Sequence, residues 1–523
     1  MRPLDLAIIV IYLAAMPAIG VYVGRKQKSA ADYFVGERSL PWPAVMLSVV
    51  ATETSTLTVI STPGLVFGNG FLFLQLAFGY IIGRTIAAFV LLPRYFQGRM
   101  VSAYGYLGKR FGSGLQGTAS LTFVITRLLA EGVRLFAGAI PIKVILAHYN
   151  VHVDYWVIVV VLTALTLIYA YVGGIKAVVW VDVIQLTLYL GGAAVAAIVL
   201  LGKLPGDWAG QASADGKFML VDFGKNLLTS PYAFVTAILG GAALSMASHG
   251  ADQLIAQRLM ATRSLRDGQK ALIGSGILVT VQFALFLLVG SMLWVFYGRQ
   301  SVAQLGMQSP DDVFSRFIID DLPVGVSGLL IAGVLASTMG ALASALNALS
   351  TSTVADLYQR FTKRSPEDSK LLQHGRMWTL IWAVVFALFA SLFSTTKNSV
   401  IELGLAITGY TYGALLGAFL LGLLIKKARQ VDAIIAFVTT VVVMAFVILG
   451  VKFSAASGSI IGIDFSKAAG DKVALAYPWY TLLGVVITLV VGGLLSLRHK
   501  TPDPLAAESE KAPEPEPEPV VAK

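Results

Sequence analysis

The sequence predicts an all-α integral membrane protein with about 13 transmembrane helices. Hydrophobic residues make up 56% of its 523 residues, and charged residues make up only 13%. A soluble domain is about a quarter charged, so a chain of this composition could not cover its surface with polar groups in water. The apolar residues also form long continuous runs, unlike the short alternating segments of a membrane β-barrel.

A helix needs about 20 apolar residues to cross the hydrocarbon core of a bilayer. The stretches that meet this requirement are 4–24, 43–67, 71–93, 117–147, 155–172, 177–202, 232–252, 271–297, 323–353, 377–395, 399–424, 431–452 and 476–497. The first is longer than the core of a signal peptide and runs directly into Arg25 and Lys26. We therefore expect it to be retained as a helix.

The basic residues predict the orientation of the chain. The net charge is +10, and the connections after odd-numbered stretches, together with the C-terminus, hold more than twice as many lysines and arginines as the other connections. Positive charge marks the cytoplasmic side of a membrane protein. We therefore expect an exterior N-terminus, a cytoplasmic C-terminus and no nucleic-acid partner. The sequence has no cysteine, which excludes disulfides, thiolate metal sites and a cysteine nucleophile.

The segments outside the membrane are short. Three exterior segments, 204–231, 298–322 and 453–475, are long enough for short helices but not for domains. The final segment, 501–523, contains proline alternating with glutamate, which cannot bury a core and predicts a disordered tail.

Ionisable side chains at membrane depth are costly, and each one is a functional hypothesis. They are Glu53, Arg84, Arg127, Glu131, Arg134, Asp182 and, near the end of a stretch, Asp252. Glu131 lies four residues after Arg127 and three before Arg134, so the three can pair on neighbouring helix turns. A structural role is therefore one interpretation of Arg127 and Glu131. The role of Arg84 stays open, and Asp182 is a lone carboxylate in its apolar helix.

Two stretches are interrupted by polar or small residues. In 43–67, hydroxyl and carboxyl side chains crowd the segment from Thr52 to Thr62, followed by Pro63 and Gly64. The run could be a continuous helix whose hydroxyls bond back to the preceding turn. We favour a broken helix whose free carbonyls line a watery cavity. The stretch 232–252, five stretches later, is interrupted from Gly240 onward. Interrupted helices at corresponding positions predict an inverted repeat of two five-helix halves.

The stretch 323–353 is rich in small residues. Ser337 and Ser344 lie on one face of the predicted helix, with Gly340 and Ala341 between them. Small residues also allow close helix packing in lipid, which is the alternative interpretation. A hard cation such as sodium prefers oxygen ligands. Hydroxyls and free carbonyls from this stretch and from 43–67 would suit it.

At this point the sequence resembles the sodium:solute symporter family in three places. The stretch Gly173-Gly174-Ile175-Lys176-Ala177-Val178-Val179-Trp180-Val181-Asp182-Val183-Ile184-Gln185 is close to the most specific family signature. Residues 252–258 resemble the end of its second broken helix, and residues 345–358 the end of its cation-binding helix. The resemblance spans about residues 4–497. It implies a LeuT-type 5+5 fold and sodium-coupled symport of a small solute by alternating access.

With this resemblance the chain divides into six predicted parts. They are a first helix and cytoplasmic loop (1–40), a first repeat of five helices (41–202), an exterior loop (203–231), a second repeat (232–424), two additional helices (425–500) and the tail (501–523).

The resemblance also implies the ion sites. The carbonyl ligands of a first sodium ion fall on Ala51, Thr54 and Ser337, and its hydroxyl ligands fall on Gly340 and Ala341. The family usually has serine or threonine at both of the last two positions, so these hydroxyls are missing. Oxygens from Thr54, Ser337, Ser344 or Glu53 are the candidate replacements. Because Gly340 and Ala341 are small, we expect them to leave room beside the helix of 323–353. A second sodium position would use Asp182 with Ser344.

The substrate positions implied in the same way are Ser55, Thr56, Thr58, Gln75 and Arg134. An arginine facing the cavity would bind a carboxylate through two parallel hydrogen bonds. An organic acid or acidic sugar is therefore favoured over an uncharged sugar or an amino acid.

Two other function classes remain open from the sequence. A proton-coupled or uncoupled carrier is suggested by Gly340, Ala341 and Glu53, and a sensory membrane protein could share the fold, although no kinase-like domain follows here. No metal-ligand cluster, phosphate loop or nucleophile–base pair predicts an enzyme. The expected partners are sodium, a small solute and the lipid bilayer of the cell membrane, of the bacterial inner-membrane type. Nothing in the sequence predicts an oligomeric state.

Overall fold

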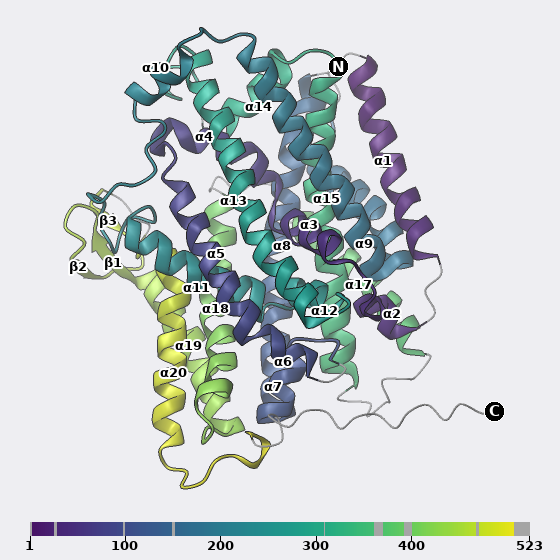
Figure 1. Cartoon of the computed structure of the whole chain (residues 1–523), viewed down its shortest axis with the longest axis vertical. Coiled ribbons are helices and arrows are strands. Elements are labelled where there is room, and N and C mark those ends of the chain that lie inside the picture. The colour runs from purple at the N-terminus through teal and green to yellow at the C-terminus, as the bar shows by residue number, and fades with distance from the viewer. Residues whose placement is uncertain are drawn as a thin grey trace.

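The computed structural model describes residues 3–25, 29–97, 100–148, 152–307, 309–359, 370–391, 400–466 and 470–506. Long helices run roughly along one direction of the molecule (Figure 1). Helices α8 (Ser113–His148) and α15 (Val326–Ser352) lie near its middle, α1 (Pro3–Gly24) and α9 (Tyr155–Leu201) toward one side, and α19 (Gln430–Gly450) and α20 (Pro478–Ser496) on the other. Within the described residues, each apolar stretch of the sequence lies mostly in helix. The long helices are α1 (Pro3–Gly24), α5 (Phe73–Val90), α8 (Ser113–His148), α9 (Tyr155–Leu201), α13 (Leu265–Phe296), α15 (Val326–Ser352), α17 (Lys370–Ser391), α18 (Val400–Leu424), α19 (Gln430–Gly450) and α20 (Pro478–Ser496).

Two apolar stretches are divided into shorter helices. The first forms α3 (Trp42–Glu53) and α4 (Thr56–Asn69). The second forms the π-helical segment η2 (Thr236–Gly240), α11 (Gly241–Met246) and the π-helical segment η3 (Ala247–Ala251), followed by α12 (Gln253–Met260). By length and composition, 8 of the described helices can cross a membrane alone, and the bent pair α3–α4 makes up to 9. The predicted number of 13 membrane helices is therefore not confirmed.

Helix α9 joins two of the predicted spans. Gly174 interrupts it with φ 49° and ψ −150°, a conformation that residues with a Cβ rarely adopt. The neighbouring Gly173 touches α1, because a Cβ on Gly24 would lie 2.0 Å from the Gly173 Cα. The glycine pair in the signature segment therefore permits both the kink and the close crossing of α1 over α9.

Shorter elements connect these helices. They are α2 (Ala30–Val35), η1 (Gly36–Arg38), α6 (Leu92–Phe96), α7 (Tyr104–Phe111), α10 (Trp208–Ala214), α14 (Asp311–Asp320) and the π-helical η4 (Thr353–Tyr358), which continues α15. The exterior segments 204–231 and 298–322, which are long enough for short helices, contain α10 and α14. Residue Asp503, in the first part of the predicted tail, donates its backbone NH to the Lys426 carbonyl at 2.9 Å. The tail beyond residue 506 lies outside the described residues.

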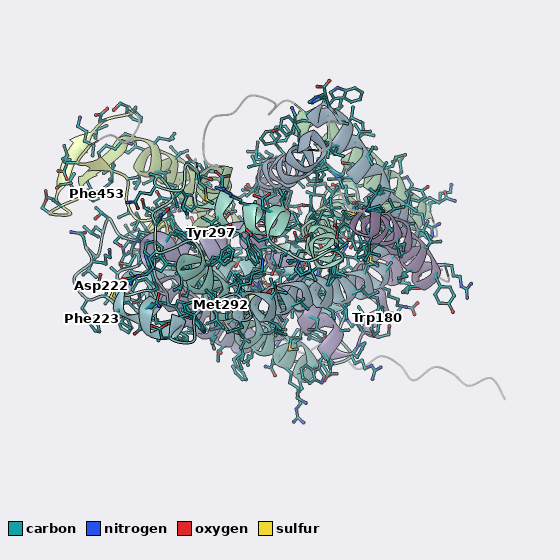
Figure 2. All side chains as sticks on the ribbon, turned by 90° about the horizontal axis from the view of Figure 1, so that it is seen from above. Trp180, Asp222, Phe223, Met292, Tyr297 and Phe453 are labelled. Carbon is teal, nitrogen blue, oxygen red and sulfur yellow. The ribbon has the colours of Figure 1, made fainter. Side chains whose placement is uncertain are left out.

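The segment 453–475, which is long enough for a short helix, contributes to a small sheet instead. Strands β1 (Val451–Ser454), β2 (Ile460–Ile463) and β3 (Lys472–Val473) pair antiparallel in the order β2-β1-β3. Isoleucines and valines favour strands, and Gly458 at φ +73° lies in the turn between β1 and β2. Phe453 of this sheet and Phe223 of the exterior segment after α10 lie on one side of the molecule, away from Trp180 of α9 (Figure 2).

Helix α15 forms the core of the protein. The apolar part of the continuous helix Val326–Tyr358 is 94% buried, whereas that of α1 is only 28% buried. A helix that is apolar on all sides must be surrounded by others. Helices α9, α8, α17 and α3 pack around α15. Its small residues therefore face mainly protein, and polar groups beside them are withdrawn from lipid.

Candidate functional site

The first broken helix opens between Glu53 and Thr56. Thr54 leaves the helical region, with φ −77° and ψ 107°, and its hydroxyl donates to the Val50 carbonyl at 2.8 Å. The backbone NH of Ser55 donates to Oγ1 of Thr58 at 3.3 Å. The predicted break is therefore confirmed. Because the last carbonyls of a helix have no amide donor within it, the end of α3 offers free carbonyl oxygens to the interior.

The second broken helix opens at Asp252. This residue is extended, with φ −92° and ψ 129°, between the π-helical turn η3 and α12. Its Oδ1 accepts the backbone NH of Leu254 at 2.8 Å, which caps the start of α12. The second predicted interruption is confirmed as well, and its sharp break lies at the end of the small-residue segment.

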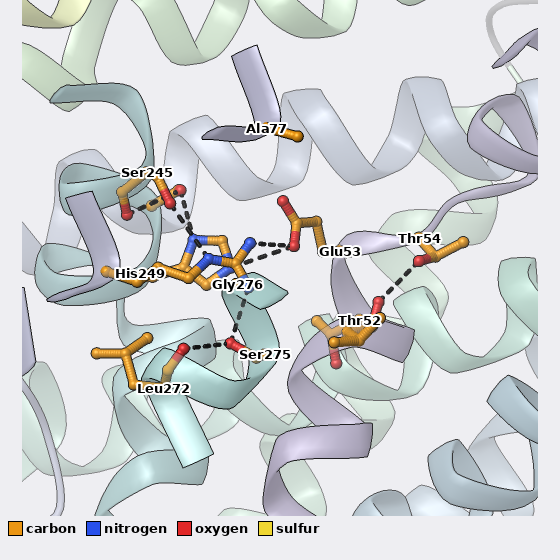
Figure 3. A network of polar contacts seen from close by, with 12 residues as sticks. Thr52, Glu53, Thr54, Ala77, Ser245, His249, Leu272, Ser275 and Gly276 are labelled. Atoms are coloured by element: carbon orange, nitrogen blue, oxygen red, sulfur yellow. Dashed lines mark hydrogen bonds and ion pairs between the residues drawn. The ribbon is translucent and has the colours of Figure 1, made fainter. Parts of the chain in front are cut away.

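An ion pair holds the first break to the neighbouring helices (Figure 3). Nη2 of Arg84 on α5 donates to Oε2 of Glu53, and the Arg84 guanidinium also donates to Ser245 at 3.3 Å and to Ser275 at 2.8 Å. Nε2 of His249 lies 3.5 Å from the same Glu53 oxygen. The Arg84 side chain is 0% exposed. This pairing gives Arg84 a role that the sequence left open, and Glu53 is the partner of a buried cation.

A second set of ion pairs joins α8 to the second break. Oε1 of Glu131 accepts from Arg127 at 2.9 Å and from Arg134 at 3.0 Å, as the spacing of the three residues predicts. Arg127 also donates to Oδ2 of Asp252 at 2.5 Å and to the hydroxyl of Tyr412 at 2.8 Å. The pairing with Asp252 was not predicted, because the two residues are 125 positions apart. The set contains two guanidinium and two carboxylate groups and is electrically neutral.

A small pocket brings several predicted site residues together. Its lining residues are Ser55, Glu131, Arg134, Leu135, Ser337, Thr338, Ala341 and Leu342. Ser55 and Arg134 were predicted for the substrate, and Ser337 and Ala341 for the first sodium ion. The Arg134 side chain is 31% exposed. Its only hydrogen bond to a described residue goes to Glu131, so the rest of its guanidinium can meet a solute.

The other predicted substrate residues lie differently. The Thr58 hydroxyl is engaged in the local contact with the Ser55 backbone. Gln75 is 1% exposed, and its Nε2 donates to the carbonyls of Leu72 and Tyr232. Neither Thr58 nor Gln75 lines the pocket. Thr56 is the first residue of α4, and its side chain lies outside the described part of the structure.

The carboxylate of Asp182, the lone carboxylate of its apolar helix, is paired with side chains of other helices. Its Oδ2 accepts from Oγ of Ser48 at 2.6 Å and from Nη2 of Arg258 at 3.2 Å. The same Nη2 donates to Oγ of Ser344, which also donates to the Gly340 carbonyl at 2.6 Å. Asp182 and Ser344 therefore come together as predicted, but the guanidinium of Arg258 lies between them. The pairing of Arg258 was not predicted, although Arg258 is the last residue of the segment 252–258 that carries part of the family resemblance.

The glycine at position 340 does not leave room beside α15. A Cβ added there would lie 2.4 Å from Oε1 of Gln185 and 3.2 Å from Oδ1 of Asp182. The expectation of free space at this position is therefore wrong, since the Gln185 amide fills it. Gln185 ends the signature segment, and that was the only sequence signal for its role.

Broken helices that meet polar side chains at the centre of a multi-pass helical bundle define a secondary active transporter of the membrane. The chain is similar in fold to a solved Na⁺-coupled sialic acid symporter in a substrate-bound outward-open state, with a TM-score of 0.82 at 24% identity, over 96% of this chain and 99% of the other. It is 27% identical over 494 residues to the sodium/sialic acid symporter SiaT of Proteus mirabilis, covering 90% of this chain and 95% of that protein. It is 26% identical over 465 residues to the sodium-coupled monocarboxylate transporter 1 of Xenopus laevis, covering 87% and 73%.

The sodium:solute symporter family matches residues 33–440, and the chain belongs to this family. Its fold is the LeuT-type arrangement that the resemblance implied. It is a sodium-coupled symporter and not an enzyme, with sodium as the coupling ion.

Proposed function

We propose that this symporter carries a carboxylate-bearing solute, with an acidic sugar of the sialic acid type as the first candidate. The observation that supports this choice is the guanidinium of Arg134, which is 31% exposed and borders the pocket beside Ser55. A guanidinium offers a planar fork of donors that matches a carboxylate. The names of SiaT and of the monocarboxylate transporter point to the same chemistry.

The charges around the pocket favour co-transport of a cation with such a solute. Arg127, Arg134, Glu131 and Asp252 already balance one another. A carboxylate that binds Arg134 therefore adds an unbalanced negative charge in a weakly screened interior. A sodium ion bound nearby would restore neutrality, which gives a physical reason for the two to bind together.

The first sodium site is proposed at the border of the same pocket. The end of α3 offers the carbonyls of Ala51 and Thr54, and Ser337 with Ala341 contributes to the pocket wall. Gly340, the remaining implied position, supplies no side-chain oxygen. With the solute beside Ser55 and the ion beside Thr54, two neighbouring residues of one break would contact the two transported species.

The orientation and the repeat boundaries belong to the proposal too. We place the N-terminus outside and the C-terminus inside the cell membrane, with repeats at 41–202 and 232–424. Because the chain has no cysteine, single cysteines can report the orientation. An impermeant thiol reagent applied to whole cells should label Ser457→Cys, between β1 and β2, and should leave Lys427→Cys, after α18, unlabelled. The reverse pattern would contradict the orientation.

Uptake into proteoliposomes tests the function. Radiolabelled N-acetylneuraminic acid is expected to accumulate when sodium is imposed outside, and to accumulate little with potassium in its place. Glucose and proline at the same concentration are the neutral and zwitterionic controls. Pyruvate serves as a simple monocarboxylate for comparison. If glucose or proline accumulates and neither the acidic sugar nor pyruvate does, the proposed substrate class is overturned. Equal uptake without sodium would overturn the coupling.

A further inference from the structure

A buried network of side chains leads from the pocket to the second break. It consists of Arg134, Glu131, Arg127, Asp252 and Tyr412, and is called the arginine network below. The Arg134 side chain is 31% exposed and borders the pocket. The side chains of Arg127, Glu131 and Asp252 are 5%, 2% and 1% exposed. A solute can therefore pair with the cation at one end, while the other end stays inside the protein.

Glu131 links the two arginines of α8 through one oxygen. Its Oε1 accepts from Nη1 of Arg127 at 2.9 Å and from Nη1 of Arg134 at 3.0 Å. The contact with Glu131 is the only hydrogen bond of Arg134 to a described residue. The direction of the Arg134 guanidinium therefore depends on where this oxygen lies, and Arg127 pulls on the same oxygen from the other side.

Tyr412 of α18 holds the far end of Arg127. Its hydroxyl accepts from Nη2 of Arg127 at 2.8 Å and donates to Oδ2 of Asp252 at 3.0 Å. One residue earlier on each helix, the hydroxyl of Thr126 donates to the hydroxyl of Thr411 at 3.2 Å, which fixes α18 against α8. Because the guanidinium is planar and rigid, a constraint on Nη2 also fixes Nη1, the nitrogen that contacts the shared carboxylate.

Asp252 anchors the network in the backbone. Its Oδ2 accepts from Arg127 at 2.5 Å and from the Tyr412 hydroxyl, and its Oδ1 accepts the backbone NH of Leu254 at 2.8 Å. Helix α18 packs against both α8 and η3, the turn that precedes Asp252. The buried end of the network is therefore held by three elements of the fold, and the end at the pocket is held only through Glu131.

We propose that Tyr412 and Arg127 are positioning residues for the solute, which hold Glu131 and, through it, the guanidinium of Arg134 in the orientation that receives a carboxylate. A fork that is already oriented loses less conformational freedom when its ligand binds. Tyr412 is not among the described residues that line the pocket, so its effect on the solute is indirect. The inference rests on the proposed function for the acidic solute.

A double-mutant cycle tests the proposal. Uptake of N-acetylneuraminic acid into proteoliposomes at saturating sodium gives a half-saturation concentration and a maximal rate for each variant. Tyr412→Phe keeps the ring and removes the hydroxyl. It should raise the half-saturation concentration by about 3- to 10-fold with little change in the maximal rate, within the range of coupling between residues of one network. When Arg134→Lys is already present, Tyr412→Phe should cause no further rise, because residues that act through each other are not additive.

Tyr95→Phe is the matched control. The Tyr95 hydroxyl is buried and donates to the carbonyl of Gly250, two residues before Asp252, so it is bound at the same break but outside the arginine network. Its removal should leave the half-saturation concentration unchanged. If the Tyr412 hydroxyl only stabilised the break, both tyrosine variants would lower the unfolding temperature and the maximal rate and neither would change the half-saturation concentration. That result would overturn the proposal.

Arg127→Lys provides a second test that does not depend on Tyr412→Phe. Lysine keeps the charge, but its single ammonium group cannot bridge the network from two ends of a plane. The half-saturation concentration should rise in this variant too, and again only when Arg134 is present. An unchanged value in both Tyr412→Phe and Arg127→Lys, or an equal rise in the Arg134→Lys background, would overturn the proposal.

These outcomes are separate from the proposed function. Sodium-driven uptake of N-acetylneuraminic acid by the unaltered protein would still support that function if the cycle were additive. If the unaltered protein carried neither this sugar nor pyruvate, both the proposed function and the positioning roles of Tyr412 and Arg127 would be overturned.

Discussion

Arg258 and Asp182 form a buried ion pair across 76 residues of sequence, with Nη2 and Oδ2 3.2 Å apart. Both side chains are 1% exposed. The arginine also donates from Nε to Ser48 of α3 at 2.9 Å and from Nη1 to the Leu254 carbonyl at 2.7 Å. The second broken helix, the first broken helix and α9 are therefore tied together at one guanidinium. Any movement of α12 during transport must change the environment of Asp182.

This relationship predicts a double effect for Asp182→Asn. The sodium concentration for half-maximal uptake should rise, because a charged ligand is lost. Stability should also fall by about 3–5 kcal/mol, since Arg258 becomes an unpaired buried charge. Denaturation and uptake measured on the same preparation check the two effects. Adding Arg258→Gln should recover part of the stability but not the sodium dependence. Recovery of both would show that Asp182 acts only as the partner of Arg258.

Arg134→Lys keeps the charge and removes the planar fork. We expect the apparent affinity for an acidic solute to fall by an amount that corresponds to about 1–3 kcal/mol, the range for charge-assisted hydrogen bonds. Solute-dependence curves for uptake at saturating sodium check this. Glu131→Gln is the structural comparison, because it removes the carboxylate shared by Arg127 and Arg134. Normal transport by Arg134→Lys, with misfolding of Glu131→Gln, would assign Arg134 a structural role.

Glu53→Gln is expected to destabilise the protein. It is not expected to change how uptake depends on pH. The variant leaves the fully buried guanidinium of Arg84 without its carboxylate, which costs about 3–5 kcal/mol for a pair of this kind. Chemical denaturation checks the loss, and uptake at several pH values with sodium held constant checks the coupling. A stable Glu53→Gln protein whose uptake has lost a pH dependence present in the unaltered protein would instead make Glu53 a proton carrier.

Ala341→Ser should tighten sodium binding a few-fold. Ala341 lines the pocket next to Ser337, so a hydroxyl there can reach the proposed first ion position. Gly340→Ser, one position earlier, should weaken binding, because its Cβ meets the Gln185 amide. Sodium titrations of uptake and of the unfolding temperature measure the difference between these adjacent substitutions. Equal effects of the two serines would contradict the geometry.

The exterior pair of Asp215 and Arg299 makes a prediction about pH. Hydrogen bonds from Arg299 and Trp294 lower the pKa of Asp215 to about 2, below the ordinary value near 3.8. The carboxylate therefore stabilises this contact fully above about pH 4, and the contribution is lost as pH falls toward 2. Below pH 4, the Asp215→Asn protein should lose less stability per pH unit than the unaltered protein. Parallel pH dependence of the two unfolding temperatures would exclude a contribution from the pair.

The sequence by itself determined the helices and their breaks. Continuous apolar runs predict the long helices. In the bilayer core a backbone segment must hydrogen-bond its own NH and carbonyl groups, and a helix does this. Both breaks could be located from the sequence as well. Hydroxyl side chains precede Pro63 and small residues precede Asp252, and a membrane helix tolerates such an interruption only where its backbone lines an interior cavity. The i, i+3 and i, i+4 pairs around Glu131 could also be predicted, since helix geometry fixes such neighbours locally.

Only the tertiary structure decided which distant charges meet. Glu53 with Arg84, Arg127 with Asp252 and Asp182 with Arg258 are 31, 125 and 76 residues apart. Helical periodicity tells which residues share a face but not which helix packs against that face or at what height. The oxygen of Gln185 beside Gly340 depends on the same unknowns, because a displacement of α9 along α15 by one turn, about 5.4 Å, would separate them. Helix packing therefore set the polar partners, while the sequence had already set the helices.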